Sequence, residues 1–449
     1  MVVGGVTAGI AAALEARRVN PDLEVSVFEK SKHVAFSPCG LPWAIGGDVP
    51  DFSALAPYTP ADFAERGIRA LVMHEVHEID LDRGSAEVRD HANNRSWREE
   101  FDAVLIATGA SPVRGDIDGV DLPGVHTLRS IEDGEAVARA LASGARRAVI
   151  VGGGYIGLVM SEVFRRRGLE VTLIEQLPRL MGSLDQEIAD ITLEALERGG
   201  TTVLLETMVQ GLAGTGKVER VLTSRGEVEA DIVLLTAGVR PNSDLAHAMG
   251  VETNPLGAIR VNDRLETNLP NVWAAGDVAE AHHLVTRRPA YVPLGSTASK
   301  QGRVAGANMA GRDARFAGIV GTTVTRAFDL SIAMTGLSEV DAAALDLPAT
   351  SVTVTDMDRA PFFPGASPIT VKLVYQPGDG RLLGAQIAGE GIAVKRIDVI
   401  ATLLERGGTV DDLTKLDLAY APPFSPMLDP LIVAAERALG QRRAGRKNR

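Results

Sequence analysis

The feature that most constrains the fold is a strand, glycine-rich turn and helix pattern that occurs twice in the 449 residues. The first copy reads Val2-Val3-Gly4-Gly5-Val6-Thr7-Ala8-Gly9, and the second reads Val149-Ile150-Val151-Gly152-Gly153-Gly154-Tyr155-Ile156-Gly157. Each copy is followed by an apolar strand that ends in an acid, Glu29 or Glu175. In a dinucleotide-binding unit the glycines admit a pyrophosphate, the helix N-terminus supplies N–H donors, and the acid accepts from ribose hydroxyls. The first copy has Val6 in place of its middle glycine and is weak alone, but the pair predicts two nucleotide-binding domains.

Further apolar segments indicate how the chain passes between these domains. Residues 101–110 and 232–241 are each an apolar run followed by a turn of small residues. We interpret them as the crossings where the chain leaves the first domain and returns to it. Residues 271–277 form another apolar strand that ends in Gly276 and Asp277, where an acid can accept from a flavin ribityl hydroxyl. We therefore expect a flavin in the first domain and a nicotinamide in the second.

Cys39 is the only cysteine of the chain. A disulfide needs two cysteines and a zinc site usually needs several ligands, so neither accounts for it. A lone cysteine is often a small buried apolar residue. This one lies in Phe36-Ser37-Pro38-Cys39-Gly40-Leu41-Pro42-Trp43, soon after the first nucleotide-binding unit. That position favours a catalytic thiol.

In this order the motifs resemble the FAD- and NAD(P)H-dependent pyridine nucleotide-disulfide oxidoreductases over nearly the whole chain. Three features resemble the single-cysteine branch of that superfamily, which contains coenzyme A disulfide reductases, NADH-dependent persulfide and polysulfide reductases, and NADH oxidases. They are Cys39 before Gly40-Leu41-Pro42, residues 291–303, and residues 395–398 together with 420–424.

The resemblance implies an α/β fold with two Rossmann-like three-layer domains and an α+β C-terminal dimerisation domain. Residues 1–112 and 240–317 would form the FAD-binding domain, with the NAD(P)H-binding domain, 113–239, inserted into it. Residues 318–449 would form the dimerisation domain, where 321–325, 351–355 and 369–375 alternate like antiparallel strands. Only three residues precede the first glycine turn, whereas a buried parallel strand usually has about five. The basic end 441–449 is expected to be solvated and disordered.

The same resemblance assigns the site residues. We expect the flavin to be bound by Gly4, Gly5, Thr7, Ala8, Gly9, Glu29, Lys30, Ser37, Pro38, Thr108, Gly109, Gly276, Asp277, Gly295, Thr297 and Ala298. We expect the nicotinamide nucleotide to be bound by Gly152, Gly153, Gly154, Tyr155, Ile156, Gly157, Glu175 and Gly238. Tyr155 is expected to cover the flavin when no nicotinamide is bound. The thiolate of Cys39 would attack a substrate disulfide and keep one half as a mixed disulfide, which electrons from the flavin would resolve.

The acceptor is left open among three hypotheses. Gly40-Leu41-Pro42 favours reduction of a low-molecular-weight disulfide, persulfide or polysulfide, with coenzyme A as a candidate. The alternatives are an NADH oxidase or peroxidase that forms a sulfenic acid, and a redox-signalling flavoprotein. Tyr420 and Phe424 are expected to reach Cys39 of the partner in a homodimer. Coenzyme A reductases are expected to place two tyrosines there, so Phe424 puts the physiological disulfide in doubt.

Two residues at the expected nicotinamide site, Glu175 and Val159, affect how the nucleotide would bind. Glu175 lies where the 2′-phosphate of NADPH would sit, so its charge predicts that NADH is preferred. Val159 stands where relatives carry a glutamate that helps to hold the carboxamide, and valine accepts no hydrogen bond. Either turnover is slow, or another group such as Glu162 takes its place.

Composition excludes other classes of function. A net charge of −12 argues against nucleic acid or an anionic membrane as the main partner. No apolar run reaches the roughly 18 residues needed to span a bilayer, and no signal-peptide pattern opens the chain, so we expect a cytoplasmic protein. The pair His282-His283 has no acid or cysteine at ligand spacing, so no metal site is expected.

Overall fold

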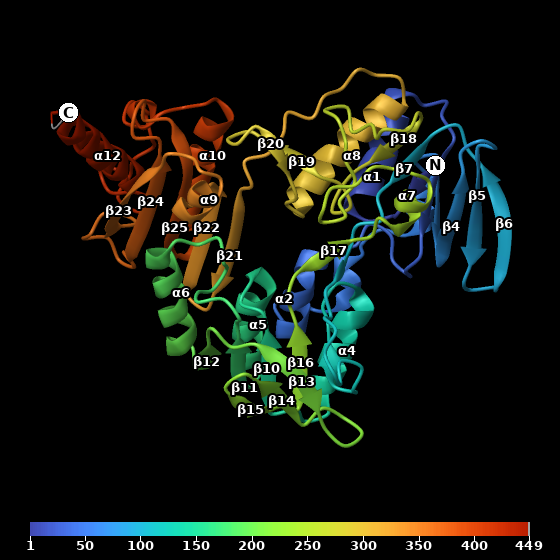
Figure 1. Ribbon diagram of the computed structural model, residues 1–449, viewed down its shortest axis with the longest axis horizontal. Helices are drawn as coiled ribbons and strands as arrows, with labels where there is room; N and C mark the ends of the chain where they lie inside the picture. The colour runs from blue at the N-terminus through green and yellow to red at the C-terminus, as the bar shows by residue number, and fades with distance from the viewer. Residues whose placement is uncertain (448–449) are drawn as a thin grey trace.

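The computed structural model describes residues 1–447, whose three five-stranded sheets are two parallel sheets and one antiparallel C-terminal sheet (Figure 1). The first parallel sheet has the strand order β18-β7-β1-β2-β3. Its strands are β1 (Val2–Val3), β2 (Val25–Glu29), β3 (Ile68–Val72), β7 (Val104–Ile106) and β18 (Val272–Ala274). Strand β1 has only two residues. It is buried and pairs on both sides, with β2 and β7.

Helices α1 (Thr7–Val19) and α8 (Gly295–Met309) pack tightly against each other beside this sheet. Their facing residues are small, and Ala12, Ala13 and Ala305 are almost fully buried. The Cys39 region follows β2 as η1 (Pro38–Gly40) and α2 (Leu41–Gly46), then η2 (Phe52–Leu55) and α3 (Pro60–Ala64). An antiparallel sheet of β4 (His74–Asp80), β5 (Ser85–Asp90) and β6 (Arg95–Glu100) lies at the outer side, with α7 (Asp244–Ala248) against β4.

The second parallel sheet has the order β12-β11-β10-β16-β9. Its strands are β9 (Val125–His126), β10 (Arg147–Val151), β11 (Glu170–Ile174), β12 (Thr201–Leu204) and β16 (Ile232–Leu235). Helices α4 (Ile131–Ala142), α5 (Tyr155–Arg166) and α6 (Gln186–Arg198) accompany it, with a small sheet of β13 (Val209–Ala213), β14 (Arg220–Thr223) and β15 (Gly226–Glu229). Strand β16 is apolar throughout, and β10 is apolar after Arg147, because a covered parallel sheet buries both faces.

The two crossings between the parallel sheets lie side by side. β8 (Ala110–Pro112) and β17 (Val239–Pro241) pair antiparallel, with Pro112 opposite Val239. Asn242 ties them further, because its Nδ2 donates to the Thr108 carbonyl (2.9 Å) and its carbonyl accepts from Thr108 Oγ1 (2.7 Å). The domain boundaries 1–112, 113–239, 240–317 and 318–449 stay a prediction, which this pairing supports.

The C-terminal sheet is antiparallel, in the order β21-β22-β25-β24-β23. It consists of β21 (Thr323–Ala327), β22 (Leu330–Gly336), β23 (Thr350–Met357), β24 (Pro368–Tyr375) and β25 (Leu382–Glu390). The hairpin β19 (Ala281–His283) and β20 (Arg288–Ala290) precedes it; α9 (Glu339–Ala344), η3 (Gly391–Arg396), α10 (Ile397–Glu405), α11 (Val410–Leu413) and α12 (Pro430–Lys447) complete the chain. Two Rossmann-like parallel sheets and an antiparallel C-terminal sheet confirm the predicted fold class.

The expectation of a solvated end is wrong in part. Helix α12 continues to Lys447, and the side chain of Arg442 is largely buried against Asp411, with Nη1 2.6 Å from Oδ2. Residues 448–449 lie outside the described part of the chain. Among residues 1–447, no helix is both long and apolar enough to cross a bilayer.

Candidate functional site

The two glycine turns have the same geometry, and both require glycine. Gly4 has φ +105° and Gly152 has φ +112°. A Cβ on Gly4 would lie 2.2 Å from the Ala107 carbonyl oxygen, and one on Gly152 would lie 2.7 Å from that of Thr236. Each turn thus passes directly over the neighbouring strand end, which brings its backbone N–H groups to the edge where parallel-sheet proteins bind ligands.

The acids that follow the turns also lie alike. Glu29 Oε2 accepts from the Gly5 N–H (2.7 Å), and Glu175 Oε2 accepts from the Gly153 N–H (2.7 Å). The other oxygen accepts from Ser31 in the first case (2.8 Å) and from Leu177 in the second (2.9 Å). Both carboxylates are therefore fixed beside a glycine turn, and each retains lone pairs for a ribose hydroxyl.

Three helices begin beside this edge without a side-chain cap. Their N-cap residues are Val6 for α1, Gly154 for α5 and Leu294 for α8, and none makes a side-chain capping hydrogen bond. The first N–H groups of a helix need acceptors, and the helix dipole favours an anion there. Pyrophosphate oxygens are suitable acceptors, so the residues present fit both a flavin and a nicotinamide dinucleotide.

One cavity of about 1550 Å³ connects the two glycine turns with Cys39. It extends between both parallel sheets and the C-terminal sheet, because β21 and β22 contribute to its wall. Of the predicted site residues, the cavity is lined by Thr7, Ala8, Pro38, Cys39, Gly109, Gly152, Gly154, Tyr155, Ile156, Glu175, Gly238, Gly276, Asp277, Gly295 and Ala298.

The other predicted residues do not line this cavity. Most of them belong to the same glycine turns and to the segments next to lining residues: Gly4, Gly5, Gly9, Glu29, Lys30, Ser37, Thr108, Gly153, Gly157 and Thr297. Tyr420 and Phe424 instead lie on the C-terminal domain, where their side chains are 47% and 77% exposed. Within one chain, therefore, the structure does not bring these two together with Cys39.

Cys39 is exposed to the cavity in the one-turn helix η1, immediately before α2. Pro38 occupies the first position of η1, where its missing N–H is not needed. Gly40 fits closely, since a Cβ there would lie 2.3 Å from a methyl group of Leu55. The sulfur of Cys39 is thus accessible from the cavity, as a nucleophile requires.

Arg129 is a site residue that the sequence did not predict. Its Nη2 lies 2.7 Å from Oδ2 of Asp277, and both side chains line the cavity. Tyr291 also lines it and donates through its hydroxyl to the Asp277 carbonyl (2.9 Å), and burial raises the pKa of Tyr291. Asp277 is thus held from two sides, and no local motif signals this because Arg129 and Asp277 are 148 residues apart.

Val159 stands where relatives carry a glutamate, and the structure shows what surrounds it. Val159 lines the cavity and is 8% exposed. Glu162, one turn later, does not line the cavity, and its carboxylate binds Arg326 through Nε (3.1 Å) and Nη2 (2.5 Å). Arg166 lies 3.6 Å from the same carboxylate. The suggestion that Glu162 replaces the missing glutamate is therefore not supported, because that group is already paired.

Tyr155 connects the second glycine turn with the C-terminal sheet. Its hydroxyl lies 2.7 Å from Oγ1 of Thr323 on β21 and 3.5 Å from the sulfur of Met334 on β22. Burial raises the pKa of Tyr155, so the phenol is protonated at neutral pH. This contact lies in the wall of the cavity, which Tyr155, Thr323 and Met334 all line.

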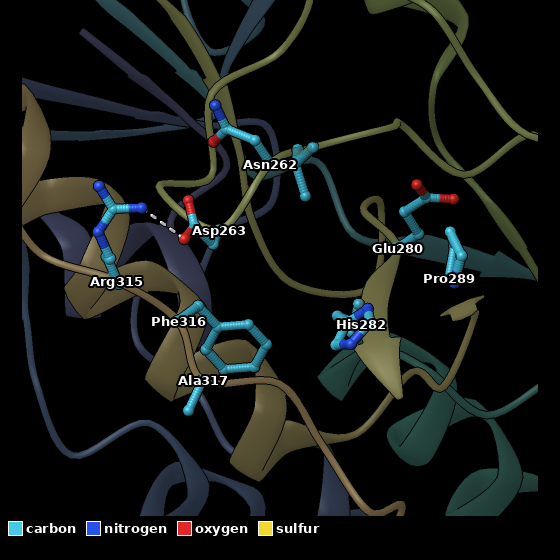
Figure 2. Close-up of a pocket in the computed structure, with 10 residues that line it drawn as sticks. Asn262, Asp263, Glu280, His282, Pro289, Arg315, Phe316 and Ala317 are labelled. Carbon is cyan, nitrogen blue, oxygen red and sulfur yellow. Dashed lines mark hydrogen bonds and ion pairs between the residues drawn. The ribbon is translucent and has the colours of Figure 1, made fainter. Parts of the chain in front are cut away.

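A second cavity, of about 610 Å³, lies away from these residues (Figure 2). Asp263 and Arg315 pair at one side of it (2.6 Å), and Glu280 and His282 lie at the other. None of the predicted site residues lines it.

Two family models match the chain. Residues 1–307 match the pyridine nucleotide-disulphide oxidoreductase model, and residues 322–431 match the dimerisation domain of the same family. An NAD(P)H coenzyme A polysulfide/persulfide reductase from Pyrococcus horikoshii is 38% identical over 97% of each chain. An NADH oxidase from Methanocaldococcus jannaschii is 34% identical over 98% of each chain.

A solved structure gives the same result. The NAD-dependent persulfide reductase from A. fulgidus superposes with a TM-score of 0.96 at 36% identity, covering 99% of this chain and 83% of that one. The family uses FAD and NAD(P)H, and the glycine turns, acids and uncapped helices described above fit both. The chain therefore belongs to the pyridine nucleotide-disulfide oxidoreductases, as an FAD-dependent enzyme related to coenzyme A-linked sulfur reductases and NADH oxidases.

Proposed function

We propose that this enzyme reduces a low-molecular-weight disulfide, persulfide or polysulfide at Cys39, with NADH as the preferred electron donor. The observation that supports the proposal most is the cavity of about 1550 Å³. It connects the two glycine turns with Cys39, whose sulfur is the only one of the chain that can form a disulfide. The relative from Pyrococcus horikoshii, named for coenzyme A polysulfide and persulfide, supports this class of acceptor.

Binding of the dinucleotides follows from the two turns. The first turn, the α1 and α8 N-termini and Asp277 would hold FAD, and the second turn, the α5 N-terminus and Glu175 would hold the nicotinamide dinucleotide. When bound, FAD would supply the two electrons, taken from the nicotinamide, that a chain with one cysteine needs to break a mixed disulfide. Tyr155 and Thr323 would shield this region from water.

Cys39 is the residue that reacts with the substrate. Its thiolate attacks one sulfur of the substrate disulfide, so a bond forms between Cys39 Sγ and that sulfur while the substrate S–S bond breaks. The second half leaves as a thiolate and takes a proton from solvent. Exposure of Cys39 to the cavity gives the substrate the in-line access that this displacement requires.

The preference for NADH rests on Glu175. The carboxylate is fixed by the N–H groups of Gly153 and Leu177, beside the turn that receives the ribose. A 2′-phosphate would meet this negative charge. The cation nearby in sequence, Arg179, donates through Nε to the Gly182 carbonyl (3.2 Å), which supports the acid as the determinant.

We further propose a homodimer in which the C-terminal domain completes the partner's site. Phe362, Phe424 and Met427 are 77% to 83% exposed in the single chain, an unusual amount of apolar surface for one domain. The match to a dimerisation domain over residues 322–431 supports a second copy as its cover. Tyr420 and Phe424 would then lie near Cys39 of the partner subunit. A cytoplasmic location stays a prediction.

The test measures NADH and NADPH oxidation with coenzyme A disulfide, polysulfide and oxygen in parallel, for the native protein and for Cys39→Ser. We expect sulfur-substrate turnover to exceed oxygen turnover and to fall by orders of magnitude in Cys39→Ser, while NADH still bleaches the flavin. Near-normal reductase activity of Cys39→Ser would contradict the proposal. Faster turnover with oxygen would favour the oxidase alternative. The similarity to an NADH oxidase from Methanocaldococcus jannaschii supports that alternative. Flavin reduction without turnover of any acceptor would favour the signalling alternative.

A further inference from the structure

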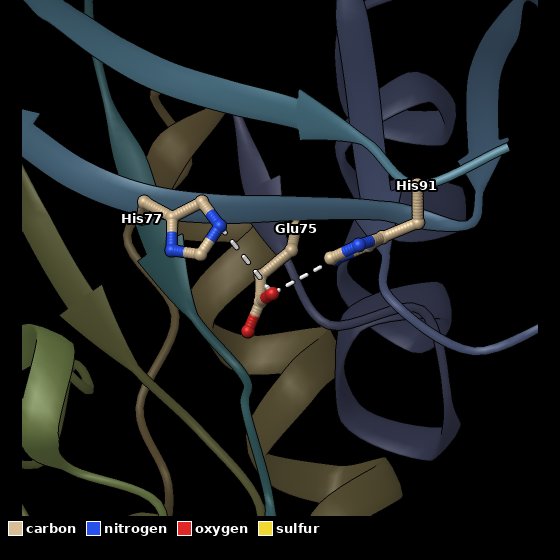
Figure 3. A group of neighbouring side chains, drawn as sticks. All are labelled: Glu75, His77 and His91. Atoms are coloured by element: carbon tan, nitrogen blue, oxygen red, sulfur yellow. Dashed lines mark hydrogen bonds and ion pairs between the residues drawn. The ribbon is translucent and has the colours of Figure 1, made fainter. Parts of the chain in front are cut away.

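We propose that Glu75, His77 and His91 form a binding site for one zinc-like divalent cation on the outer surface of the FAD domain. Figure 3 shows the two imidazoles directed at the carboxylate from either side. Glu75 and His77 belong to β4, and His91 is the first residue after β5. This place lies on the antiparallel sheet β4-β5-β6, and none of the three residues lines the cavity of Cys39.

The distances between the three ligand atoms suit such an ion. Nε2 of His91 lies 2.9 Å from Oε2 of Glu75, and Nε2 of His77 lies 3.5 Å from the same oxygen. All three atoms lie within 4.8 Å of one another. A tetrahedral zinc ion with bonds of about 2.0–2.1 Å separates its ligand atoms by roughly 3.3 Å. Small rotations of exposed side chains are therefore enough to close the site.

The strand pairing explains why His77 can join the group. The register of β4 against β5 shifts between Val76 and Glu78, so His77 is the extra residue of a β-bulge. A bulge locally changes the direction of a side chain, and bulges are frequent at functional sites. Glu75 and His77 would already share a face as alternate residues of one strand, and the bulge leaves the imidazole of His77 close to the carboxylate.

Hydrogen bonds to the side chain of Asp90 fix the turn that carries His91. The carboxylate of Asp90 accepts from the N–H groups of Ala92 and Asn93 (both 3.0 Å) and from Nδ2 of Asn93 (2.7 Å). The N–H of His91 itself donates to the Met73 carbonyl (2.9 Å). The backbone on both sides of the site is thus held before any ion arrives, which reduces the entropy cost of binding.

The donor set selects the class of cation. Two imidazole nitrogens and one carboxylate oxygen suit zinc and its neighbours, whereas calcium and magnesium prefer oxygen ligands throughout. Three protein ligands leave one position for water, as in open zinc sites. The ion would also link β4 to the turn between β5 and β6, so binding should stabilise this sheet.

The experiment titrates ZnCl₂ into untagged, FAD-loaded protein that carries Cys39→Ser, so that the thiol is not a competing ligand. Calorimetry in the presence of a competing chelator measures stoichiometry and affinity. We expect one zinc ion per chain, and a loss of affinity of more than about tenfold in His77→Gln and in His91→Gln. His282→Gln is the matched control, because this exposed histidine lies outside the group.

A second readout separates binding from folding. Zinc should raise the unfolding temperature of the parent and of His282→Gln, but not that of His77→Gln or His91→Gln, while all four keep the same flavin content. Less than one zinc per chain in the parent would overturn the proposal. Equal affinity in parent and His77→Gln, or an equal loss in His282→Gln, would overturn it as well.

Discussion

The guanidinium of Arg326 lies over the indole of Trp43, with its Cζ 4.6 Å from the ring centre. Arg326 belongs to β21 of the C-terminal domain, and Trp43 belongs to α2, which directly follows Cys39. The same guanidinium binds the buried carboxylate of Glu162 on α5. One side chain therefore connects the C-terminal sheet with helices α2 and α5, by a cation–π contact and an ion pair.

Removal of this connection should destabilise the fold. In Arg326→Ala, Glu162 keeps only Arg166, at 3.6 Å. We expect the free energy of unfolding to fall by about 1–3 kcal/mol, less than for a fully buried pair because Arg326 is 42% exposed. Chemical denaturation, monitored by flavin and tryptophan fluorescence, measures this free energy of unfolding. The double variant with Glu162→Gln should recover part of the loss, and additive losses would show that the two residues do not interact.

Stability should depend on acid pH through Asp231. This carboxylate accepts from Arg147 Nη2 (2.9 Å) and from the N–H groups of Arg146 and Arg147, and the Arg147 bond chiefly lowers its pKa to about 2. Because the folded pKa is lower than the unfolded one, the stabilisation is full above about pH 4 and is lost as pH falls toward 2. Asp231→Asn should therefore cost about 2 kcal/mol at pH 7, and this difference should shrink below pH 4.

The control for that prediction is Asp121→Asn. Asp121 also pairs with an arginine, Arg114, at 3.0 Å, but its side chain is 84% exposed. Such a pair contributes little. Urea unfolding at several pH values measures the free energy of unfolding of the native protein, Asp231→Asn and Asp121→Asn. An equal loss in both variants would show that the backbone hydrogen bonds of Asp231 do not contribute to stability.

Nucleotide preference should follow the charge of Glu175. We expect higher kcat/KM with NADH than with NADPH, and a ratio about tenfold smaller in Glu175→Gln, which corresponds to roughly 1.4 kcal/mol of repulsion. Glu29→Gln changes the equivalent bond of the first turn and should leave the ratio unchanged. Comparable efficiency with both nucleotides in the native protein would contradict the assignment of Glu175.

The Val159→Glu substitution tests the missing carboxamide contact. Val159 lines the cavity beside the second glycine turn, so a carboxylate there can accept from an amide in the cavity. We expect faster flavin reduction by NADH in stopped-flow measurements, while Val159→Leu leaves the rate close to native. An unchanged rate in Val159→Glu would mean that another group already holds the nicotinamide.

Sedimentation should show a dimer that depends on the apolar surface of the C-terminal domain. Phe424→Asp and Met427→Asp place charge on that surface and should shift the protein toward monomer with loss of disulfide reductase activity. Leu256→Asp is the control, because Leu256 is 65% exposed but lies in the middle of the chain, outside the matched dimerisation segment. A fully active monomer would contradict a shared site.

Sequence predicted those parts of the site that depend on local backbone geometry. Gly4 and Gly152 could be recognised because a close backbone approach excludes every larger residue, and the acids followed from their fixed distance after each turn. The pairs Arg129–Asp277 and Arg326–Glu162 could not, because they join residues 148 and 164 positions apart and leave no periodic pattern. The group of Glu75, His77 and His91 could not be predicted either, because the pairing of β4 with β5 brings His91 to a carboxylate 16 positions earlier in the chain.

The pairing of β8 with β17 has a consequence for how the chain can be cut and joined. Because Pro112 lies opposite Val239, the segment between them starts and finishes at neighbouring points of one short ribbon. A segment of this kind can be removed or exchanged with a short peptide bridge, without threading any other part of the chain. We therefore expect the segment between β8 and β17, which carries the second glycine turn, to be replaceable, and a chimera with the equivalent segment of a relative should retain the first sheet and bind flavin.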